Sequence, residues 1–214
     1  LFDLLKQNVH YESHEFGRDI ITQLPNRCSI YGYKFHGYWA YARTIDMYYR
    51  TNMELLSGRI KLNKWQVCTN LIEDCVLQDR LPARIEGKVF NSYISDGCII
   101  KGTVINSIIS PGVIVEKNAE IVDSVIFHNN IIKQNARLKK VICDKVCEIG
   151  EDVEIGFFGE DIPSKEYPEL VNTGITIIGK GVKINSGVKI GANTVVYAEK
   201  NIEEKVIEPG STLR

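Results

Sequence analysis

An apolar side chain recurs at every sixth position through the second half of this 214-residue chain. That period fits neither an α-helix of 3.6 residues per turn nor the long strands of an open sheet. It fits a solenoid whose short strands each send one branched side chain inward, with Gly, Asn and Asp forming the turns between them. The period comprises Ile109, Val115 and Ile121; Ile126, Ile132 and Leu138; Cys143, Ile149 and Ile155; and Ile178, Ile184, Ile190 and Val196.

A longer repeat encloses the six-residue period. Similar segments begin at Asn91, Asn106, Asp123 and Lys139, at intervals of 15, 17 and 16 residues. One coil of a solenoid cannot bury its own inner face, so its stability comes from contact with neighbouring coils. The sequence therefore predicts a mainly β domain over residues 85–214 with roughly five stacked coils.

One stretch breaks this period. Residues 156–173 contain Pro163 and Pro168 and carry no six-residue repeat. They predict a loop or arm that leaves the solenoid. A tolerated surface insertion is the simpler interpretation, and an arm that contacts a partner or ligand is the alternative.

The chain before residue 85 has a different composition, in which helix signals mix with aromatic residues. Residues 1–58 predict a small α/β domain, and residues 59–84 predict an irregular linker. The expected elements are a helix over Leu1–Asn8, a second over Glu15–Leu24 that ends at Pro25, a strand over Ser29–Phe35, and a helix that Thr44 caps and Gly58 ends.

Composition excludes several classes of function. Lys and Arg total 26 against 27 Asp and Glu, a formal net charge of −1, which predicts no broad attraction to nucleic acid or anionic membrane. No apolar run approaches the ~20 residues that span a bilayer, and no secretory leader opens the sequence. We expect an intracellular chain whose six cysteines stay reduced. Cys143 and Cys147 lack a nearby histidine that would complete a zinc site, so buried packing is expected for them.

The repeats resemble the left-handed parallel β-helix of hexapeptide-repeat proteins. The motifs that precede and enter the repeats resemble, in the same order, the C-terminal half of the glucose-1-phosphate adenylyltransferase (ADP-glucose pyrophosphorylase) family. These motifs are Phe16–Ile21, Tyr33–Trp39, Thr44–Tyr48, Asn52–Leu56, Leu81–Arg84 and Ser95–Cys98. The resemblance covers nearly the whole chain. It implies a cytoplasmic oligomer in glycogen biosynthesis, where the family makes ADP-glucose from ATP and glucose 1-phosphate.

Two departures from that family bear on catalysis. Residues 1–58 resemble only the end of the family's nucleotidyltransferase domain, without its Gly-rich ATP-binding loop. The family motif G-Y-W-x-D-V-G-T also reads differently here: Tyr41 stands where the family has an Asp that helps hold Mg²⁺, and Arg43 replaces the Gly. A neutral phenol does not replace a carboxylate ligand of Mg²⁺.

The pattern therefore resembles the non-catalytic, regulatory subunit that accompanies a catalytic subunit in Gram-positive bacteria, and a catalytic subunit is the alternative. No catalytic residue, metal ligand or cofactor is assigned to this chain, and Mg²⁺ is expected only in a catalytic partner.

The resemblance also implies an effector site. Arg84 matches the family's basic position at the entrance to the β-helix, where allosteric phosphate ligands bind related enzymes. A guanidinium suits bidentate binding of phosphate. A sugar phosphate or a nucleotide is the expected effector, and a solvated linker arginine is the simpler interpretation.

Four other interpretations of the sequence stay open. His128, the only histidine of the repeats, is the general base of a hexapeptide acyltransferase or a turn residue. The eight aromatic residues between Tyr31 and Tyr49 stack on a nucleotide or pack in a core. Gly174–Gly181 approaches a phosphate-binding loop but lacks its final Ser or Thr, and the hexad period accounts for it. A purely structural oligomerisation module needs none of these sites.

Overall fold

The computed structural model describes residues 2–10, 14–58, 60 and 81–214. Most of the linker expected at 59–84, with Cys68 and Cys75, lies outside the described residues. The chain forms two compact units, Leu1–Trp39 and Ala40–Arg214. This division groups the helix after Thr44 with the β-rich unit, whereas the boundary drawn from the family resemblance lies at residue 58. That boundary stays a prediction.

The first unit is helical where the structure describes it. It contains α1 (Phe2–Asn8), a π-helical turn η1 (Phe16–Ile20) and a 3₁₀ segment η2 (Ile21–Asn26). The first predicted helix is confirmed. In place of the second predicted α-helix, the chain forms the wider π-helical turn η1 followed by the tighter 3₁₀ segment η2. The strand predicted over Ser29–Phe35 is wrong: these residues form no strand, and Tyr31 and Tyr33 are each 91% exposed. An alternating pattern without a neighbouring strand leaves the backbone groups unpaired.

The second unit opens with the predicted capped helix. α2 (Ile45–Met53) continues into the 3₁₀ turn η3 (Glu54–Ser57). The Thr44 hydroxyl accepts a hydrogen bond from the Met47 backbone N–H at 3.2 Å, and Gly58 ends the helical segment with φ of 69°. These are the N-cap and the left-handed C-cap that the residue types predict.

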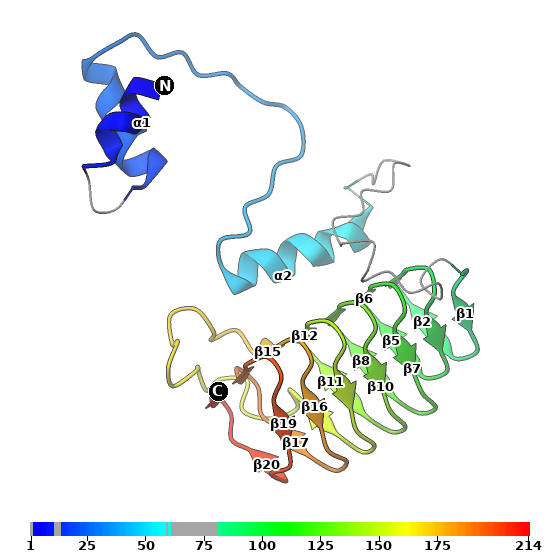
Figure 1. Ribbon diagram of the computed structural model, residues 1–214. Coiled ribbons are helices and arrows are strands. Elements are labelled where there is room, and N and C mark those ends of the chain that lie inside the picture. The colour runs from blue at the N-terminus through cyan, green and yellow to red at the C-terminus, as the bar shows by residue number, and fades with distance from the viewer. Residues whose placement is uncertain (1, 11–13, 59, 61–80) are drawn as a thin grey trace. The chain divides into compact units, whose positions relative to one another are not determined.

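Twenty-one short strands then form three seven-stranded parallel sheets, stacked as seven coils (Figure 1). Sheet A contains β1 (Arg84–Ile85), β4 (Ile99–Ile100), β7 (Ile114–Val115), β10 (Ile131–Ile132), β13 (Glu148–Ile149), β16 (Lys183–Ile184) and β19 (Asn201–Ile202). Sheet B contains β2 (Lys88–Phe90), β5 (Thr103–Ile105), β8 (Glu120–Val122), β11 (Arg137–Lys139), β14 (Glu154–Ile155), β17 (Lys189–Ile190) and β20 (Val206–Ile207). Sheet C contains β3 (Tyr93–Ile94), β6 (Ile108–Ile109), β9 (Val125–Ile126), β12 (Val141–Cys143), β15 (Thr176–Ile178), β18 (Val195–Val196) and β21 (Thr212–Leu213).

This architecture confirms the mainly β, parallel β-helix prediction and corrects the coil number from roughly five to seven. The first and last coils were missed because their apolar positions are spaced less regularly. The handedness of the helix stays a prediction from the resemblance.

The core is the column of hexad residues. Ile109 in β6, Val115 in β7 and Ile121 in β8 each have no exposed surface, so a step of six residues carries the column from sheet C to sheet A to sheet B. All thirteen residues of the period given above are buried. Each fully buried aliphatic side chain contributes about 1.5–3 kcal/mol, so the column is the main source of stability in this unit.

Asn-Ser and Asp-Ser pairs explain the longer repeat. Asn91, Asn106 and Asp123 adopt positive φ of 42°, 45° and 48°, which short polar side chains tolerate. The hydroxyl of the buried Ser107 accepts from the N–H of Ser124 at 3.0 Å, and similar bonds link successive coils. The repeat therefore recurs because each turn satisfies the backbone of the next coil.

The segment between β14 and β15 is a loop, as expected, but it does not leave the solenoid. It folds back along the last coils, where the Lys165 N–H donates to the Gly210 carbonyl at 2.8 Å and Glu166 pairs with Arg214. Ser164 in its middle is only 1% exposed. The expectation of an arm leaving the solenoid is therefore wrong, because the loop's backbone finds its partners in the final coil.

Two further expectations can be compared with the described residues. Cys143 and Cys147 are buried free thiols, as predicted for packing residues. Cys98 is also a buried free thiol, and Cys28 is exposed. No described helix combines the length and apolarity needed to cross a bilayer.

Candidate functional site

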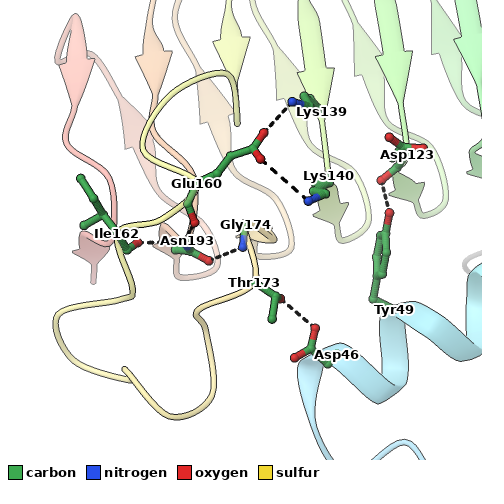
Figure 2. Close-up of polar contacts among 10 residues, drawn as sticks. All are labelled: Asp46, Tyr49, Asp123, Lys139, Lys140, Glu160, Ile162, Thr173, Gly174 and Asn193. Atoms are coloured by element: carbon green, nitrogen blue, oxygen red, sulfur yellow. Dashed lines mark hydrogen bonds and ion pairs between the residues drawn. The ribbon is translucent and has the colours of Figure 1, made fainter.

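Helix α2 packs on the outer face of sheet C. The Tyr49 hydroxyl donates to the carbonyl of Asp123 at 2.5 Å, as Figure 2 shows. The Tyr48 ring lies 6.3 Å from the Phe127 ring, with the planes 33° apart. Three outward-facing aliphatic residues of this sheet are buried: Ile108, Val125 and Ile142. The helix is thus attached to the solenoid by both apolar and polar contacts.

Partial burial changes the acidity of the two tyrosines in this contact. Desolvation, with a smaller contribution from the Asp123 carboxylate, raises the pKa of Tyr49 to about 12. Desolvation also raises the pKa of Tyr48. Both phenols therefore stay protonated at neutral pH, and Tyr49 acts as a hydrogen-bond donor.

Asn193, in the turn between β17 and β18, fastens the inserted loop to the solenoid. Its side chain is fully buried, donates to the carbonyls of Glu160 at 3.0 Å and Ile162 at 2.7 Å, and accepts from the Gly174 N–H at 2.7 Å (Figure 2). One amide thereby satisfies three backbone groups of the loop. Because unpaired buried backbone groups are costly, this residue determines the path of the loop.

The loop in turn touches both β11 and α2. Lys139 pairs with Glu160 at 2.5 Å, Lys140 approaches the same carboxylate at 4.0 Å, and these lysines lower the pKa of Glu160. Thr173, near the end of the loop, donates to the Asp46 carboxylate of α2 at 2.7 Å (Figure 2). Helix, loop and solenoid therefore form one connected junction, which we call the α2 junction.

A groove of about 450 Å³ lies at the α2 junction. Its walls include the rings of Tyr48 and Phe127, and its polar rim includes His128, Asp144 and Lys145. Gly179 and three aliphatic residues of sheet C complete the lining; the three are Ile142, Ile177 and Ile178. This volume falls within the range of small-molecule sites.

The lining suits binding rather than covalent chemistry. It offers aromatic and aliphatic surface, one carboxylate, one ammonium and one imidazole, and it contains no Ser, Thr or Cys nucleophile. His128 lies in a turn, as one of its two sequence interpretations expected. Asp144 lines the same groove 16 positions away, a proximity that sequence spacing did not reveal. Within the described ranges, no three His, Cys, Asp or Glu residues gather as a metal site.

Arg84 does not lie at this groove. It begins β1 of sheet A, its side chain is 71% exposed, and it forms an ion pair with Glu86 at 2.8 Å. An exposed guanidinium is accessible to a phosphate, which would compete with one carboxylate.

The two residues that depart from the family motif contact each other. The Arg43 guanidinium donates to the Tyr41 hydroxyl at 3.3 Å. A phenol and a cation therefore occupy the place where the resemblance puts a metal-binding carboxylate, and a cation there disfavours Mg²⁺.

The fold bears on two further interpretations of the sequence. Gly174–Gly181 contains strand β15, with Ile175 and Ile178 buried. The phosphate-binding loop is therefore wrong, and the assignment of this segment to the six-residue repeat is confirmed. The aromatic residues between Tyr31 and Tyr41 are exposed, so core packing is wrong for them, whereas Tyr48 and Tyr49 pack on sheet C. Nucleotide stacking by this cluster stays a prediction.

The comparisons with known proteins agree first on the class. Residues 76–178 match the family described as GlmU-like, C-terminal hexapeptide. The chain is thus a parallel β-helix with a hexapeptide-repeat domain.

Curated relatives are more specific. The chain is 34% identical over 203 residues to a glucose-1-phosphate adenylyltransferase of Acetivibrio thermocellus, covering 94% of this chain and 47% of that protein. It is 35% identical over 209 residues to the protein of that name from Thermomicrobium roseum, covering 93% and 47%. The chain spans about half the length of these relatives.

Solved structures add little. The acetyltransferase domain of PglB from Neisseria gonorrhoeae FA1090 matches with a TM-score of 0.33 and 14% identity, covering 62% of this chain and 54% of that chain. A likeness of this size carries no functional argument.

Proposed function

We propose that this chain is the C-terminal, regulatory and oligomerising portion of a glucose-1-phosphate adenylyltransferase subunit, acting in cytoplasmic glycogen biosynthesis. In this proposal ADP-glucose is made from ATP and glucose 1-phosphate only together with a catalytic domain or subunit. The observation that carries it is the 34–35% identity to proteins of that name across more than nine-tenths of the chain. That span includes the α2 region as well as the repeats.

The regulatory assignment rests on two side chains at the start of the second unit. The Tyr41 hydroxyl accepts a hydrogen bond from the Arg43 guanidinium. Neither side chain supplies the anionic oxygen that Mg²⁺ requires. This combination supports the non-catalytic type of subunit found beside a catalytic one in Gram-positive bacteria.

Regulation in this proposal acts through packing rather than bond chemistry. An effector that binds one arrangement of the solenoid and its attached helix more tightly biases the catalytic partner by that difference in affinity. Two places could receive such a ligand: the exposed Arg84 guanidinium at β1, and the groove at the α2 junction.

A ligand screen tests this function against the two rival classes. Thermal unfolding of the chain is measured with glucose 1-phosphate, ATP, a series of sugar phosphates and acetyl-CoA. We expect stabilisation by a sugar phosphate or a nucleotide and none by acetyl-CoA. Stabilisation by acetyl-CoA alone would support an acyltransferase with His128 as its base, and a response to no ligand would support a purely structural module.

Arg84→Ala is the companion variant for the phosphate site. Because hydrogen bonds to charged groups contribute about 1.5–3 kcal/mol, we expect its affinity for the stabilising phosphate ligand to fall about 10- to 100-fold. Lys88→Ala, a neighbouring exposed cation on β2, is the control and should bind as the native chain does. Equal affinity in Arg84→Ala would remove Arg84 from the effector site.

A further inference from the structure

Sheet A carries an aliphatic stripe on its outer face. Ile99, Ile114 and Ile131 are the first residues of β4, β7 and β10, and the ladder pairs them directly with one another. The following residue of each strand points into the core, so these three isoleucines point outward. They are half-buried.

The corresponding stripe on sheet C shows why outward isoleucines occur in this fold. Ile108, Val125 and Ile142 hold the equivalent outward positions there, and all three are buried on the face where α2 packs. Within the described part of Ala40–Arg214, no helix packs on sheet A as α2 packs on sheet C. The stripe of sheet A is thus built like a covered face without a described helix to cover it.

A ladder of alternating charge runs beside the isoleucines. Glu86, Lys101, Glu116 and Lys133 each follow a strand of sheet A by one position. Backbone hydrogen bonds between coils keep these four residues in register. The Lys101 N–H, for example, donates at 2.7 Å to the carbonyl of Val115, the residue before Glu116. The order of signs from the first coil to the fourth is minus, plus, minus, plus.

This order is self-complementary under one particular symmetry. A twofold axis parallel to the strands, between the second and third coils, reverses the order of coils and keeps the position along each strand. Lys101 then faces Glu116 of a second copy, and Glu86 faces Lys133 of that copy. An axis through a coil would instead oppose like charges, because it pairs Lys101 with Lys133.

The same axis also matches the aliphatic stripes. Ile99 of one copy faces Ile114 of the other, and the contact repeats on the other side of the axis. Arg84 holds the stripe position of the first coil and faces Ile131 of the other copy, so the apolar match is confined to the two central coils. Apolar surface therefore meets apolar surface while opposite charges meet beside it. We propose that sheet A is the interface of a twofold homodimer of this chain, centred between its second and third coils. This inference does not depend on the proposed enzyme family.

The size of the contact sets the expected strength. Coils of a β-solenoid are about 4.8 Å apart, so the four ladder positions span about 14 Å. An interface of that extent lies at the small end, below about 1,200 Å² in total. We expect a reversible dimer that is populated at concentrations of about tens of micromolar.

The central pair is the sharpest target for a test. Glu86 is already bonded to Arg84, and Lys133 to Glu148, within one chain. One Glu116 oxygen accepts from the Gln134 N–H at 3.1 Å, which leaves its other oxygen available. In a dimer of Lys101→Glu, the introduced glutamate of each copy faces Glu116 of the other copy. In a dimer of Glu116→Lys, the introduced lysine of each copy faces Lys101 of the other copy. Sedimentation velocity of the full chain should show dimerisation weakened at least about 10-fold in each variant.

Two recombinations distinguish this interface from any other. The double variant Lys101→Glu/Glu116→Lys exchanges the signs and should dimerise within about threefold of the native chain. An equimolar mixture of the two single variants should form heterodimers, because both cross-pairs are then Glu with Lys. Lys88→Glu, the same charge change on sheet B, is the control and should dimerise as the native chain does.

Three outcomes would overturn the proposal. The first is a native chain that stays monomeric to several hundred micromolar. The second is a dimer that Lys101→Glu leaves unchanged, which would place the contact on another surface. The third is a mixture of the single variants that stays monomeric although each variant is folded by circular dichroism.

Discussion

Ile121→Ala should lower the free energy of unfolding by about 2–5 kcal/mol, the range for removing a buried isoleucine side chain beyond Cβ. Ile121 lies in β8 between Val104 of the preceding coil and Leu138 of the next, and all three side chains are fully buried. The column is continuous, so a cavity in one coil removes contacts from both neighbours. Urea unfolding followed by circular dichroism measures the loss.

Val122→Ala is the matched control for that variant. Val122 is the next residue of the same strand, but it points outward and is half-buried. We expect a loss of at most about 1 kcal/mol there, mainly from reduced strand propensity. Equal losses at the two positions would contradict the inward column that defines this fold.

Asn193→Asp should release the inserted loop. The carboxylate keeps the size of the amide and its acceptor for the Gly174 N–H, but it cannot donate to the Glu160 and Ile162 carbonyls. A buried negative charge then faces two carbonyl oxygens, and we expect a loss of about 3 kcal/mol or more. Trypsin cleavage after Lys165, in the middle of the loop, should become faster in native buffer.

Asn185→Asp makes the same chemical change at an exposed position of the solenoid. Its unfolding free energy and its rate of cleavage after Lys165 should match those of the native chain. Should Asn193→Asp behave like this control, the loop would be held by other contacts, and Asn193 would have no anchoring role.

The sequence predicts the inner column well because each residue of that column depends on only one local rule. Ile109, Val115 and Ile121 occupy three different sheets, yet their spacing of six is visible without knowledge of any long-range contact. Thr44 and Gly58 were equally predictable, because a cap and a stop are chemical properties of single residues.

The α2 junction could not be predicted in the same way. The contact between Tyr49 and Asp123 joins residues 74 positions apart, and that between Asp46 and Thr173 joins residues 127 apart. Neither pair belongs to a repeat. The groove appears only once α2 is placed on sheet C, so His128 and Asp144 could not be recognised as neighbours beforehand.

The incorrect strand at Ser29–Phe35 shows the opposite failure. Its alternation of aromatic with small or charged residues is a local strand signal, but a strand also requires a neighbour to pair with. The outward isoleucines of sheet A carry a related lesson. Local periodicity identifies which residues face the core, whereas the surface beside them is understood only when the coils are stacked in register.

Synthesis of ADP-glucose is the measurement that tests the central claim most directly. The purified chain is assayed with ATP, Mg²⁺ and glucose 1-phosphate, alone and together with a catalytic glucose-1-phosphate adenylyltransferase subunit. We predict no turnover by the chain alone, and a changed rate or effector response when it joins the catalytic subunit. Turnover by the chain alone, or a catalytic subunit that it neither binds nor affects, would contradict the account.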